Sequence, residues 1–250
     1  SDTIVYVDLI HVMGPTGNFT VVPNQGCVPL TVNISGSVQS TNTIVADHGD
    51  GTALTGNTNI IHTYTDARNY IPAFTLTDSN GCVVTYPLDT VVVGIIPYPN
   101  LSDTTVCRGN YVQFDLPLGD HFQWTSDLSS TYLTCDTCRN PISSAPDTIT
   151  YYVVATTNVG CEARDTVKVY VDALPQIQPG AYYRICPGES IILNAGNVNA
   201  ATWSPGIYMN DSNLVSPTVT PPDTITYRVT GVNATGCSVS KTVQIFVIDK

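Results

Sequence analysis

The feature that most constrains this chain is a motif that occurs twice almost unchanged. Residues 147–161 read DTITYYVVATTNVGC, and residues 223–237 read DTITYRVTGVNATGC. Each copy alternates β-branched or aromatic residues with polar ones before it reaches an Asn and a Gly-Cys pair. This pattern is typical of a β-strand that runs into a tight turn. A more diverged copy ends in FTLTDSNGC at Cys82. The repetition predicts an array of similar β-rich units.

The composition favours an all-β fold. Charged residues make up 12% of the chain, about half of the ~25% that is typical of globular proteins. The residues that usually fill exposed helix faces are therefore scarce, and Thr, Val, Ile, Asn and Tyr dominate instead. A net charge of −11 repels phosphate backbones and argues against nucleic acid as a partner. No apolar run approaches the ~20 residues of a membrane-spanning helix.

Repeated strand patterns divide the chain into units. The last strands of three units are expected to begin near Asp89, Asp165 and Lys241, and residues 2–7 (DTIVYV) fit the same pattern. Residues 1–13 are therefore predicted to be the last strand of an upstream repeat, with an ordinary N-terminal strand or linker as the alternative. Four such strands and three bodies predict a piece of a longer array. The three predicted β-sandwich domains span residues 14–96, 97–174 and 175–250.

The first domain resembles the PKD domain family, whose pattern is Trp-Asp-Phe-Gly-Asp-Gly, then His-x-Tyr, then a Tyr-Val-Leu strand. Residues 45–51 read VADHGDG, and residues 62–64 read HTY. Ala46 and His48 stand where the family has Trp and Phe, so the core of this domain must be filled differently. The matching residues are Asp47, Gly49, Asp50, Gly51, His62, Tyr64 and Tyr70.

The second and third domains match each other. Each opens with Cys-x-Gly, at Cys107 and Cys186, and each has a Trp 17 residues later, at Trp124 and Trp203. A core Trp occupies a similar strand in immunoglobulin-like sandwiches. Both domains resemble the immunoglobulin-like and PKD-like repeats of large surface and secreted proteins of gliding Bacteroidota-type bacteria. The predicted fold class is all-β, with tandem immunoglobulin-like (PKD-like) β-sandwich domains in a head-to-tail array. The core residues are expected to be Trp124, Trp203, Tyr151 and Tyr227.

Eight cysteines in a Lys-poor β protein indicate an oxidising compartment. Six of them permit two connectivities. The intradomain connectivity is Cys27–Cys82, Cys107–Cys161 and Cys186–Cys237. The interdomain connectivity is Cys27–Cys161 and Cys107–Cys237, with Cys82 and Cys186 bonded to further units. The geometry leans toward the interdomain connectivity, because a strand separates the poles of a sandwich by roughly 20 Å, whereas a disulfide needs Cα atoms within about 7 Å.

The remaining two cysteines form a CxxC motif, Cys135-Asp-Thr-Cys138. No βαβ pattern accompanies it, which argues against a redox site, and no His lies nearby in sequence to complete a zinc site. A similar Cys-x-x-Cys-x-Asn-Pro occurs in the related bacterial repeats, and Cys138-Arg-Asn-Pro141 matches it. A local structural disulfide is the favoured interpretation, with metal and redox sites as alternatives.

Catalytic motifs are missing from the sequence: there is no G-x-S-x-G, no HExxH and no P-loop. The histidines (His11, His48, His62 and His121) are scattered, and His62 is interpreted as a core or turn residue of its family. We therefore expect no enzyme and no catalytic residue. Calcium is the best metal candidate, because Asp47 and Asp50 flank a Gly-rich turn and hard oxygens suit this ion. The alternative is that both carboxylates bond turn amides.

Asp-Thr dipeptides recur along the chain, and they resemble the Asp-Thr-x acceptor sites for O-linked glycans in the same bacterial group. The alternative is that Asp ends a turn and Thr begins a strand. The candidate acceptors are Thr3, Thr90, Thr104, Thr148, Thr166 and Thr224.

The resemblance implies a repeat segment of a long extracellular filament, secreted by the type IX route and associated with the outer membrane. Its expected role is that of a structural spacer or adhesin stalk in gliding or cell adhesion. The expected partners are neighbouring repeats and surface polysaccharide. One alternative is a non-catalytic carbohydrate-binding module of a secreted enzyme, which needs a platform of exposed, coplanar aromatic rings. Most tyrosines are expected in the core, which argues against such a platform. A cell–cell recognition ectodomain is the other alternative.

Overall fold

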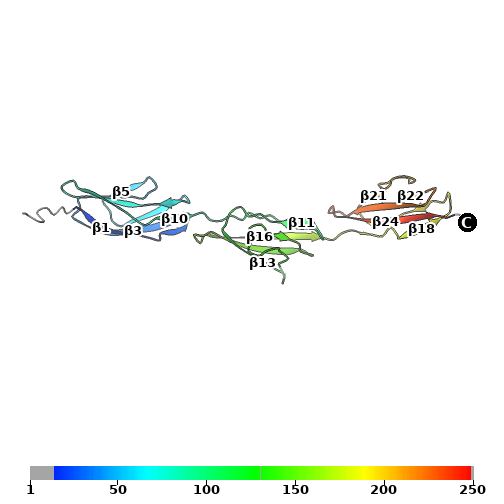
Figure 1. The fold of residues 1–250 in the computed structure, drawn as a ribbon, viewed down its shortest axis with the longest axis horizontal. Helices are drawn as coiled ribbons and strands as arrows, with labels where there is room; N and C mark the ends of the chain where they lie inside the picture. The colour runs from blue at the N-terminus through cyan, green and yellow to red at the C-terminus, as the bar shows by residue number, and fades with distance from the viewer. Residues whose placement is uncertain (1–13, 130, 249–250) are drawn as a thin grey trace, which may run out of the picture.

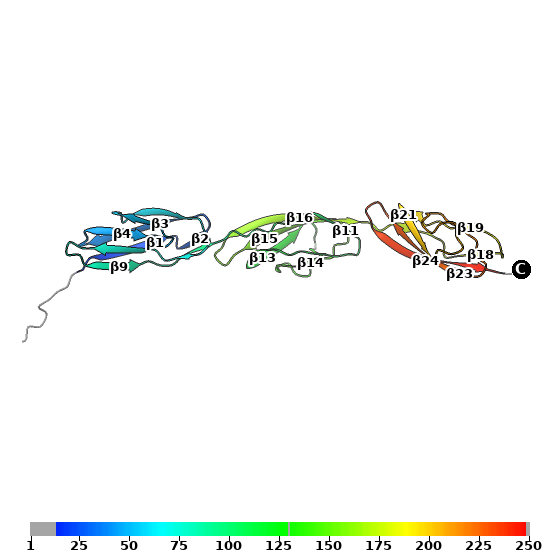
Figure 2. The ribbon, with the colours of Figure 1, turned by 90° about the horizontal axis from the view of Figure 1, so that it is seen from above.

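The computed structural model describes residues 14–129 and 131–248, so the strand predicted within residues 1–13 lies outside the described part. All named elements of the described residues are β-strands. They form three successive groups, each with its own hydrophobic core: unit one (β1 to β10), unit two (β11 to β16) and unit three (β17 to β24). The units follow one another along the long axis of the molecule (Figures 1 and 2), which gives the chain the shape of a rod.

Unit one folds into three sheets around one core. Their strand orders are β1-β3-β6, β2-β10-β7 and β5-β4-β8-β9. Strand β2 runs parallel to β10, which places the second strand of the unit beside its last strand. Side chains from all three sheets, such as Val32, Phe74 and Val91, meet in one cluster. The strands are β1 (Thr16–Val22), β2 (Gln25–Cys27), β3 (Leu30–Gln39), β4 (Thr43–Asp47), β5 (Ala53–Thr55), β6 (Ile60–Tyr64), β7 (Asn69–Tyr70), β8 (Ala73–Thr77), β9 (Val83–Pro87) and β10 (Val91–Gly94).

Unit two has one large sheet, of order β11-β16-β15-β13, and a small sheet of β12 and β14. Buried and exposed residues alternate along its main strands, as expected for a sheet with one face in the core. In β15, for example, Tyr151 and Val153 are buried and the intervening Tyr152 is exposed. The strands are β11 (Thr104–Cys107), β12 (Val112–Gln113), β13 (His121–Ser126), β14 (Ile142–Ser143), β15 (Ile149–Thr156) and β16 (Glu162–Asp172).

Unit three repeats this topology. Its large sheet has the order β18-β24-β23-β21, and β19 pairs with β22 as β12 pairs with β14 in unit two. A further small sheet joins β17 and β20. The strands are β17 (Gln176–Ile177), β18 (Tyr182–Ile185), β19 (Ile191–Ile192), β20 (Gly196–Asn197), β21 (Ala200–Ser204), β22 (Thr218–Val219), β23 (Ile225–Val232) and β24 (Ser238–Val247). The prediction of an all-β chain of tandem immunoglobulin-like sandwiches is confirmed.

Aromatic residues fill the centre of each core. Trp124 and Tyr151 are buried in unit two, and Trp203 and Tyr227 are buried in unit three. In unit one, two stacked pairs supply the aromatic volume in place of the Trp and Phe of the PKD pattern. They are Phe19 with Phe74 and Tyr64 with Tyr70, with ring centroids 3.9 and 4.1 Å apart.

The expectation that most tyrosines lie in the core is wrong. Of the 14 tyrosines in the sequence, only four are buried in the described part of the chain (Tyr64, Tyr70, Tyr151 and Tyr227). The reason is positional, because several tyrosines occupy the outward positions of strands and others lie in linkers and turns. The exposed ones are Tyr98, Tyr111, Tyr132, Tyr152, Tyr170, Tyr182 and Tyr208.

Candidate functional site at the junctions between units

A disulfide joins unit one to unit two. Cys27 ends β2 and lies opposite Gly94 of β10, at the end of unit one that faces unit two. Cys161 follows the turn between β15 and β16, at the facing end of unit two, and its Cα lies 5.5 Å from that of Cys27. A β-carbon on Gly94 would lie 3.0 Å from Sγ of Cys161 and 3.1 Å from Cβ of Val159. Glycine therefore leaves the space into which the turn of unit two fits.

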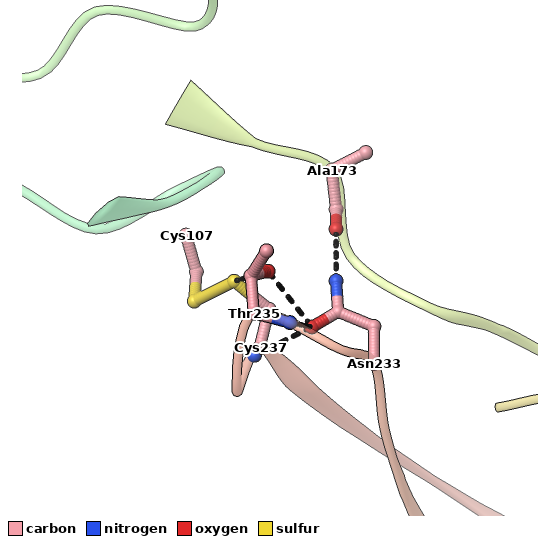
Figure 3. Close-up of a disulfide and its surroundings, with 5 residues drawn as sticks. All are labelled: Cys107, Ala173, Asn233, Thr235 and Cys237. Carbon is pink, nitrogen blue, oxygen red and sulfur yellow. Dashed lines mark hydrogen bonds between the residues drawn. A yellow bond between two sulfur atoms is a disulfide. The ribbon is translucent and has the colours of Figure 1, made fainter. Parts of the chain in front are cut away.

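A second disulfide joins unit two to unit three in the same way (Figure 3). Cys107 ends β11 opposite Asp172 of β16, and Cys237 follows the turn between β23 and β24. Their Cα atoms are also 5.5 Å apart. Asn233 connects this turn to the linker, because its Nδ2 donates to the carbonyl of Ala173 at 2.9 Å and its Oδ1 accepts from the amide of Cys237 at 2.8 Å. The junction is thus held by a covalent bond and a side-chain hydrogen bond.

The intradomain alternatives, Cys27–Cys82, Cys107–Cys161 and Cys186–Cys237, are not formed. Unit two shows the physical reason: Cys107 pairs with the last residue of β16, whereas Cys161 precedes its first residue. The 11 residues of β16 span about 35 Å at ~3.3 Å per residue, far beyond the reach of a disulfide. Within the described residues, Cys82 is exposed, Cys186 is partly exposed, and neither is in a disulfide.

The CxxC motif forms a local disulfide between Cys135 and Cys138. Its loop covers Trp124: the Trp124 amide donates to the carbonyl of Asp136 at 2.8 Å, and the indole Nε1 donates to the carbonyl of Cys138 at 2.9 Å. The bridge therefore stabilises the loop that satisfies a buried tryptophan, which is a structural role.

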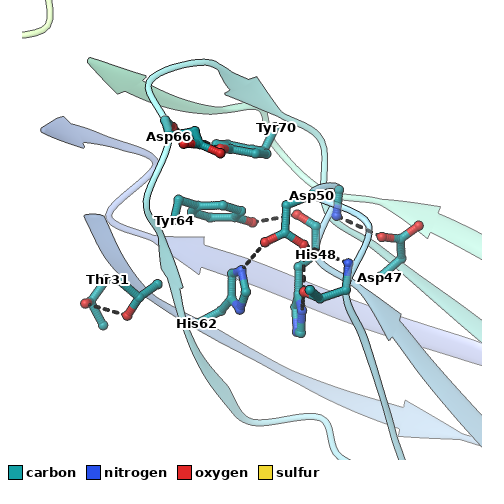
Figure 4. Close-up of polar contacts among 11 residues, drawn as sticks. Thr31, Asp47, His48, Asp50, His62, Tyr64, Asp66 and Tyr70 are labelled. Carbon is teal, nitrogen blue, oxygen red and sulfur yellow. Dashed lines mark hydrogen bonds and ion pairs between the residues drawn. The ribbon is translucent and has the colours of Figure 1, made fainter. Parts of the chain in front are cut away.

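Figure 4 shows the polar cluster of unit one that includes both calcium candidates. Asp47 Oδ1 accepts from the amide of Gly49 at 2.8 Å. Asp50 Oδ1 accepts from the amide and hydroxyl of Thr52 at 2.9 and 2.6 Å, and Asp50 Oδ2 accepts from Nε2 of His62 at 2.8 Å. Both carboxylates therefore bond turn amides, which is the alternative to calcium binding that the sequence left open. Burial alone would raise the pKa of Asp50, but the hydrogen bonds from Thr52 and His62 lower it to about 2.

His48, Asp50 and His62 place three donor atoms within 4.8 Å of one another. The imidazole rings are stacked, with centroids 4.0 Å apart and planes inclined by 13°. A metal ion lies in the plane of each imidazole that binds it, and two stacked rings have no common plane at bonding distance. One ring would have to rotate before both could bind the same ion, so the arrangement is that of a packed polar core.

Four of the candidate glycan acceptors lie at strand starts (Thr90, Thr104, Thr148 and Thr224), Thr166 lies within β16, and Thr3 is outside the described residues. Thr90, Thr148, Thr166 and Thr224 are exposed, and Thr104 is partly exposed. Two of the hydroxyls have a structural contact: Thr148 Oγ1 accepts from the amide of Val171, and Thr224 Oγ1 accepts from the amide of Val247, both at 3.1 Å. At these two positions the contacts support the alternative interpretation, in which the Thr has a structural role at the start of a strand.

The exposed ring of Tyr182 in unit three is not coplanar with the aromatic ring beside it. Tyr182, whose side chain is 58% exposed, lies 6.1 Å from Phe246, and the two ring planes are inclined by 72°. Arg184 lies over the Tyr182 ring at 5.7 Å. A flat sugar-stacking platform is therefore not built at this position.

Sequence reasoning missed the noncysteine residues of the junctions, namely Gly94, Val159, Asn233 and Ala173. Part of the signal was present, because Asn233 belongs to the repeated Asn-x-x-Gly-Cys turn. Gly94 carried no signal, since its neighbour lies in another unit, 67 residues away at Cys161.

Comparison with known proteins finds likeness only among solved structures. No protein-family model and no curated protein matches the chain. The I-band fragment I67–I69 from titin is 10% identical, with 96% of this chain and 100% of that chain covered and a TM-score of 0.44. The structure of Dpr2 Ig1–Ig2 in complex with DIP-Theta Ig1–Ig3 shares 12% identity, 94% and 99% coverage and a TM-score of 0.42.

Sidekick-1 immunoglobulin domains 1–5 are 15% identical, with 97% of this chain and 60% of that chain covered and a TM-score of 0.41. At these identities and TM-scores the likeness concerns strand architecture only. Among the described residues, no helix has the length and apolar character to cross a membrane.

Proposed function

We propose that this chain is a segment of an extracellular stalk that holds an adhesive part of a filament away from the cell surface. The observation that supports the proposal is the disulfide at each of the two junctions, which ties successive units covalently. Disulfides persist in oxidising compartments, so the bonds favour an extracellular location. A covalently tied rod resists both bending and separation of its units.

The linkers add to this stiffness. Pro97 and Pro99 flank Tyr98 between units one and two, and Pro175 follows Leu174 between units two and three. Proline fixes the φ angle of its residue and restricts the residue before it. Each junction is therefore limited by its backbone as well as by its disulfide. These features suit a spacer that transmits force along its length.

The finer proposal follows the resemblance to PKD-like and immunoglobulin-like repeats of gliding bacteria. In it, the stalk belongs to a gliding-motility adhesin that is secreted by the type IX route, is anchored at the outer membrane and contacts surface polysaccharide weakly. The net charge of −11 keeps such a filament soluble and separate from its neighbours.

Immunogold labelling of intact producing cells tests the proposal, with antibody raised against the purified chain. We expect gold particles along filaments that stand off the cell surface. Antibody adsorbed beforehand with the purified chain is the control and should give no label. Label confined to the culture medium would contradict the stalk and would favour the carbohydrate-binding module of a secreted enzyme.

A further inference from the structure

We propose that Cys82 and Cys186 are the two halves of a third junction of the same kind. The thiol of Cys82, at the end of unit one that points away from unit two, would form a disulfide with the Cys186 thiol at the far end of another unit built like unit three. For the purified protein, the partner is a second copy of this chain. The inference takes its cellular setting from the proposed stalk, but its chemistry rests on the structure alone.

The turn before Cys82 has the hydrogen bonds of the two turns that already carry junction cysteines. In unit two, the amide of Thr157 donates to the carbonyl of Cys161 at 2.9 Å, and the amide of Cys161 donates to the Thr157 side chain at 3.0 Å. In unit one, the amide of Asp78 donates to the carbonyl of Cys82 at 3.1 Å, and the amide of Cys82 donates to Asp78 Oδ1 at 2.8 Å. Cys82 is thus presented as Cys161 is.

Unit three repeats the same pair of bonds. The amide of Asn233 donates to the carbonyl of Cys237 at 3.0 Å, and the amide of Cys237 donates to Asn233 Oδ1 at 2.8 Å. In both units where this turn meets a neighbouring unit, its cysteine is disulfide-bonded to the opening cysteine of that neighbour. Cys161 and Cys237 are the counterparts of Cys82, and both are bonded to an opening cysteine. We therefore expect the partner of Cys82 to be an opening cysteine as well.

The segment around Cys186 is the counterpart of the segment around Cys107. Strand β18 runs parallel to β24 as β11 runs parallel to β16, and each cysteine ends or directly follows the first of these strands. A tight turn follows in both units: the amide of Asn110 donates to the carbonyl of Cys107 at 2.9 Å, and the amide of Glu189 donates to the carbonyl of Cys186 at 3.1 Å. Gly109 and Gly188 hold φ angles of 90° and 83° within these turns.

Ile248 gives an independent indication of a surface to which a second copy can dock. Its register places it beside Cys186, because Ile185 pairs with Val247 and the amide of Ile248 donates to the carbonyl of Ile185 at 3.1 Å. The counterpart in unit one is Gly94, which lies opposite Cys27 and against the turn of unit two. Ile248 is 48% exposed. In unit three, an apolar side chain is therefore exposed at the position whose counterpart in unit one contacts the next unit.

The bond forms by thiol–disulfide exchange with a small disulfide oxidant such as oxidised glutathione. The Cys82 thiolate attacks one glutathione sulfur, the glutathione S–S bond breaks, and one glutathione thiolate leaves. The Cys186 thiolate of the second copy then attacks the Cys82 sulfur of the mixed disulfide and releases the second glutathione thiolate. Two protein thiols are oxidised, one glutathione disulfide is reduced, and the two protons lost by the protein thiols are taken up by the leaving thiolates.

The test uses two single variants of the full chain, Cys82→Ser and Cys186→Ser, in oxidised glutathione at high protein concentration. Random collision would give a heterodimer and two homodimers in the ratio 2:1:1 from an equal mixture. We expect the ratio of heterodimer, with a Cys186–Cys82 bond between copies, to the two homodimers combined to rise several-fold above the 1:1 that random collision gives. Separation of the dimers uses non-reducing electrophoresis with one variant carrying a size tag, and peptide mapping identifies the bond.

The wild-type chain provides the second readout. Head-to-tail bonding predicts a ladder of dimers, trimers and higher species that disappears on reduction, whereas each single variant alone stops at the dimer. Peptide mapping must also show Cys27–Cys161 and Cys107–Cys237 intact, which establishes that the variants are folded. A statistical mixture of dimers, or no intermolecular bond at all, would overturn the proposal. Gold label found only in the medium would contradict the stalk and leave this result unaffected.

Discussion

At the scale of single residues, His48 is the least satisfied group in the described part of the chain. Its side chain is buried, with 3% exposure, and Nδ1 lies 2.8 Å from the hydroxyl of Thr52. That hydroxyl donates onward to Asp50, so Nδ1 carries the proton and Nε2 is the unprotonated nitrogen. Nε2 is buried without a partner. Burial first, and then the nearby His62, lower the pKa of His48.

We predict that His48→Phe removes a pH dependence from unit one. Because the folded state holds the pKa of His48 below 6.5, the unfolded chain binds the proton more readily as the pH falls below about 6.5, and stability decreases. Phenylalanine cannot titrate and fills a similar volume. Calorimetric unfolding at pH 7.5 and pH 5 should show a smaller decrease in the melting temperature of unit one for the variant.

The matched control is His121→Asn in unit two. His121 is exposed, lies in unit two and has a side-chain hydrogen bond with Asn158, so its removal should leave the acid sensitivity of unit one unchanged. Equal acid sensitivity of the wild type and His48→Phe would contradict the role assigned to His48.

At the scale of elements, β13 and β21 show two solutions to one problem. Each strand carries a buried tryptophan whose backbone amide and indole nitrogen need acceptors. In unit three, Trp203 donates to the carbonyls of Ser212 and Leu214 at 2.8 and 3.0 Å, from a loop that has no disulfide. In unit two, the acceptors lie in the loop closed by Cys135 and Cys138.

We predict that the double variant Cys135→Ser, Cys138→Ser destabilises unit two by about 2 kcal/mol, the chain-entropy value for so short a loop. The loop would open locally and expose the indole of Trp124 to exchange. Hydrogen exchange measured by NMR should then be faster at the Trp124 indole and unchanged at that of Trp203, which serves as the internal control. Equal protection of Trp124 in both proteins would show that the bridge does not stabilise the loop.

At the scale of the whole molecule, the two disulfides overlap along the chain. Cys27 bonds to Cys161 and Cys107 bonds to Cys237, so Cys107 lies inside the loop closed by the first bridge and Cys161 lies inside the loop closed by the second. A taut oxidised chain runs from the N-terminus to Cys27, across to Cys161, back to Cys107 and across to Cys237. This path contains about 95 residues, or about 330 Å at ~3.5 Å per residue, compared with about 870 Å for the reduced chain.

We predict that single-molecule pulling on the two ends shows these limits. The oxidised chain should extend to about 330 Å and the reduced chain to about 870 Å. Removal of one junction by Cys27→Ser with Cys161→Ser leaves a path of about 120 residues, which gives an intermediate limit of about 420 Å. The Cys135→Ser, Cys138→Ser variant should extend only about 5 Å further than the wild type, because that bridge lies on the segment from Cys161 back to Cys107 but bypasses only three residue steps. Extension of the oxidised chain beyond 400 Å would contradict the connectivity.

The sequence by itself determined the strands, the turns and the division into similar units. Alternating residues before Gly-Cys predicted β15 and β23, and the equal spacing from Cys107 to Trp124 and from Cys186 to Trp203 predicted two matching cores. These are local properties, because a strand with one buried face requires a period of two and a tight turn requires Gly or Asn. They can be read from neighbours in the sequence.

Only the tertiary structure decided which cysteines meet and which tyrosines are exposed. The separations of 54 residues between Cys107 and Cys161 and 134 between Cys27 and Cys161 are both compatible with a disulfide. The choice depends on which end of a sandwich each cysteine occupies and on which unit lies against that end. That information arises only when the strands have paired and the units have stacked, because a disulfide depends on distance in space and not on distance along the chain.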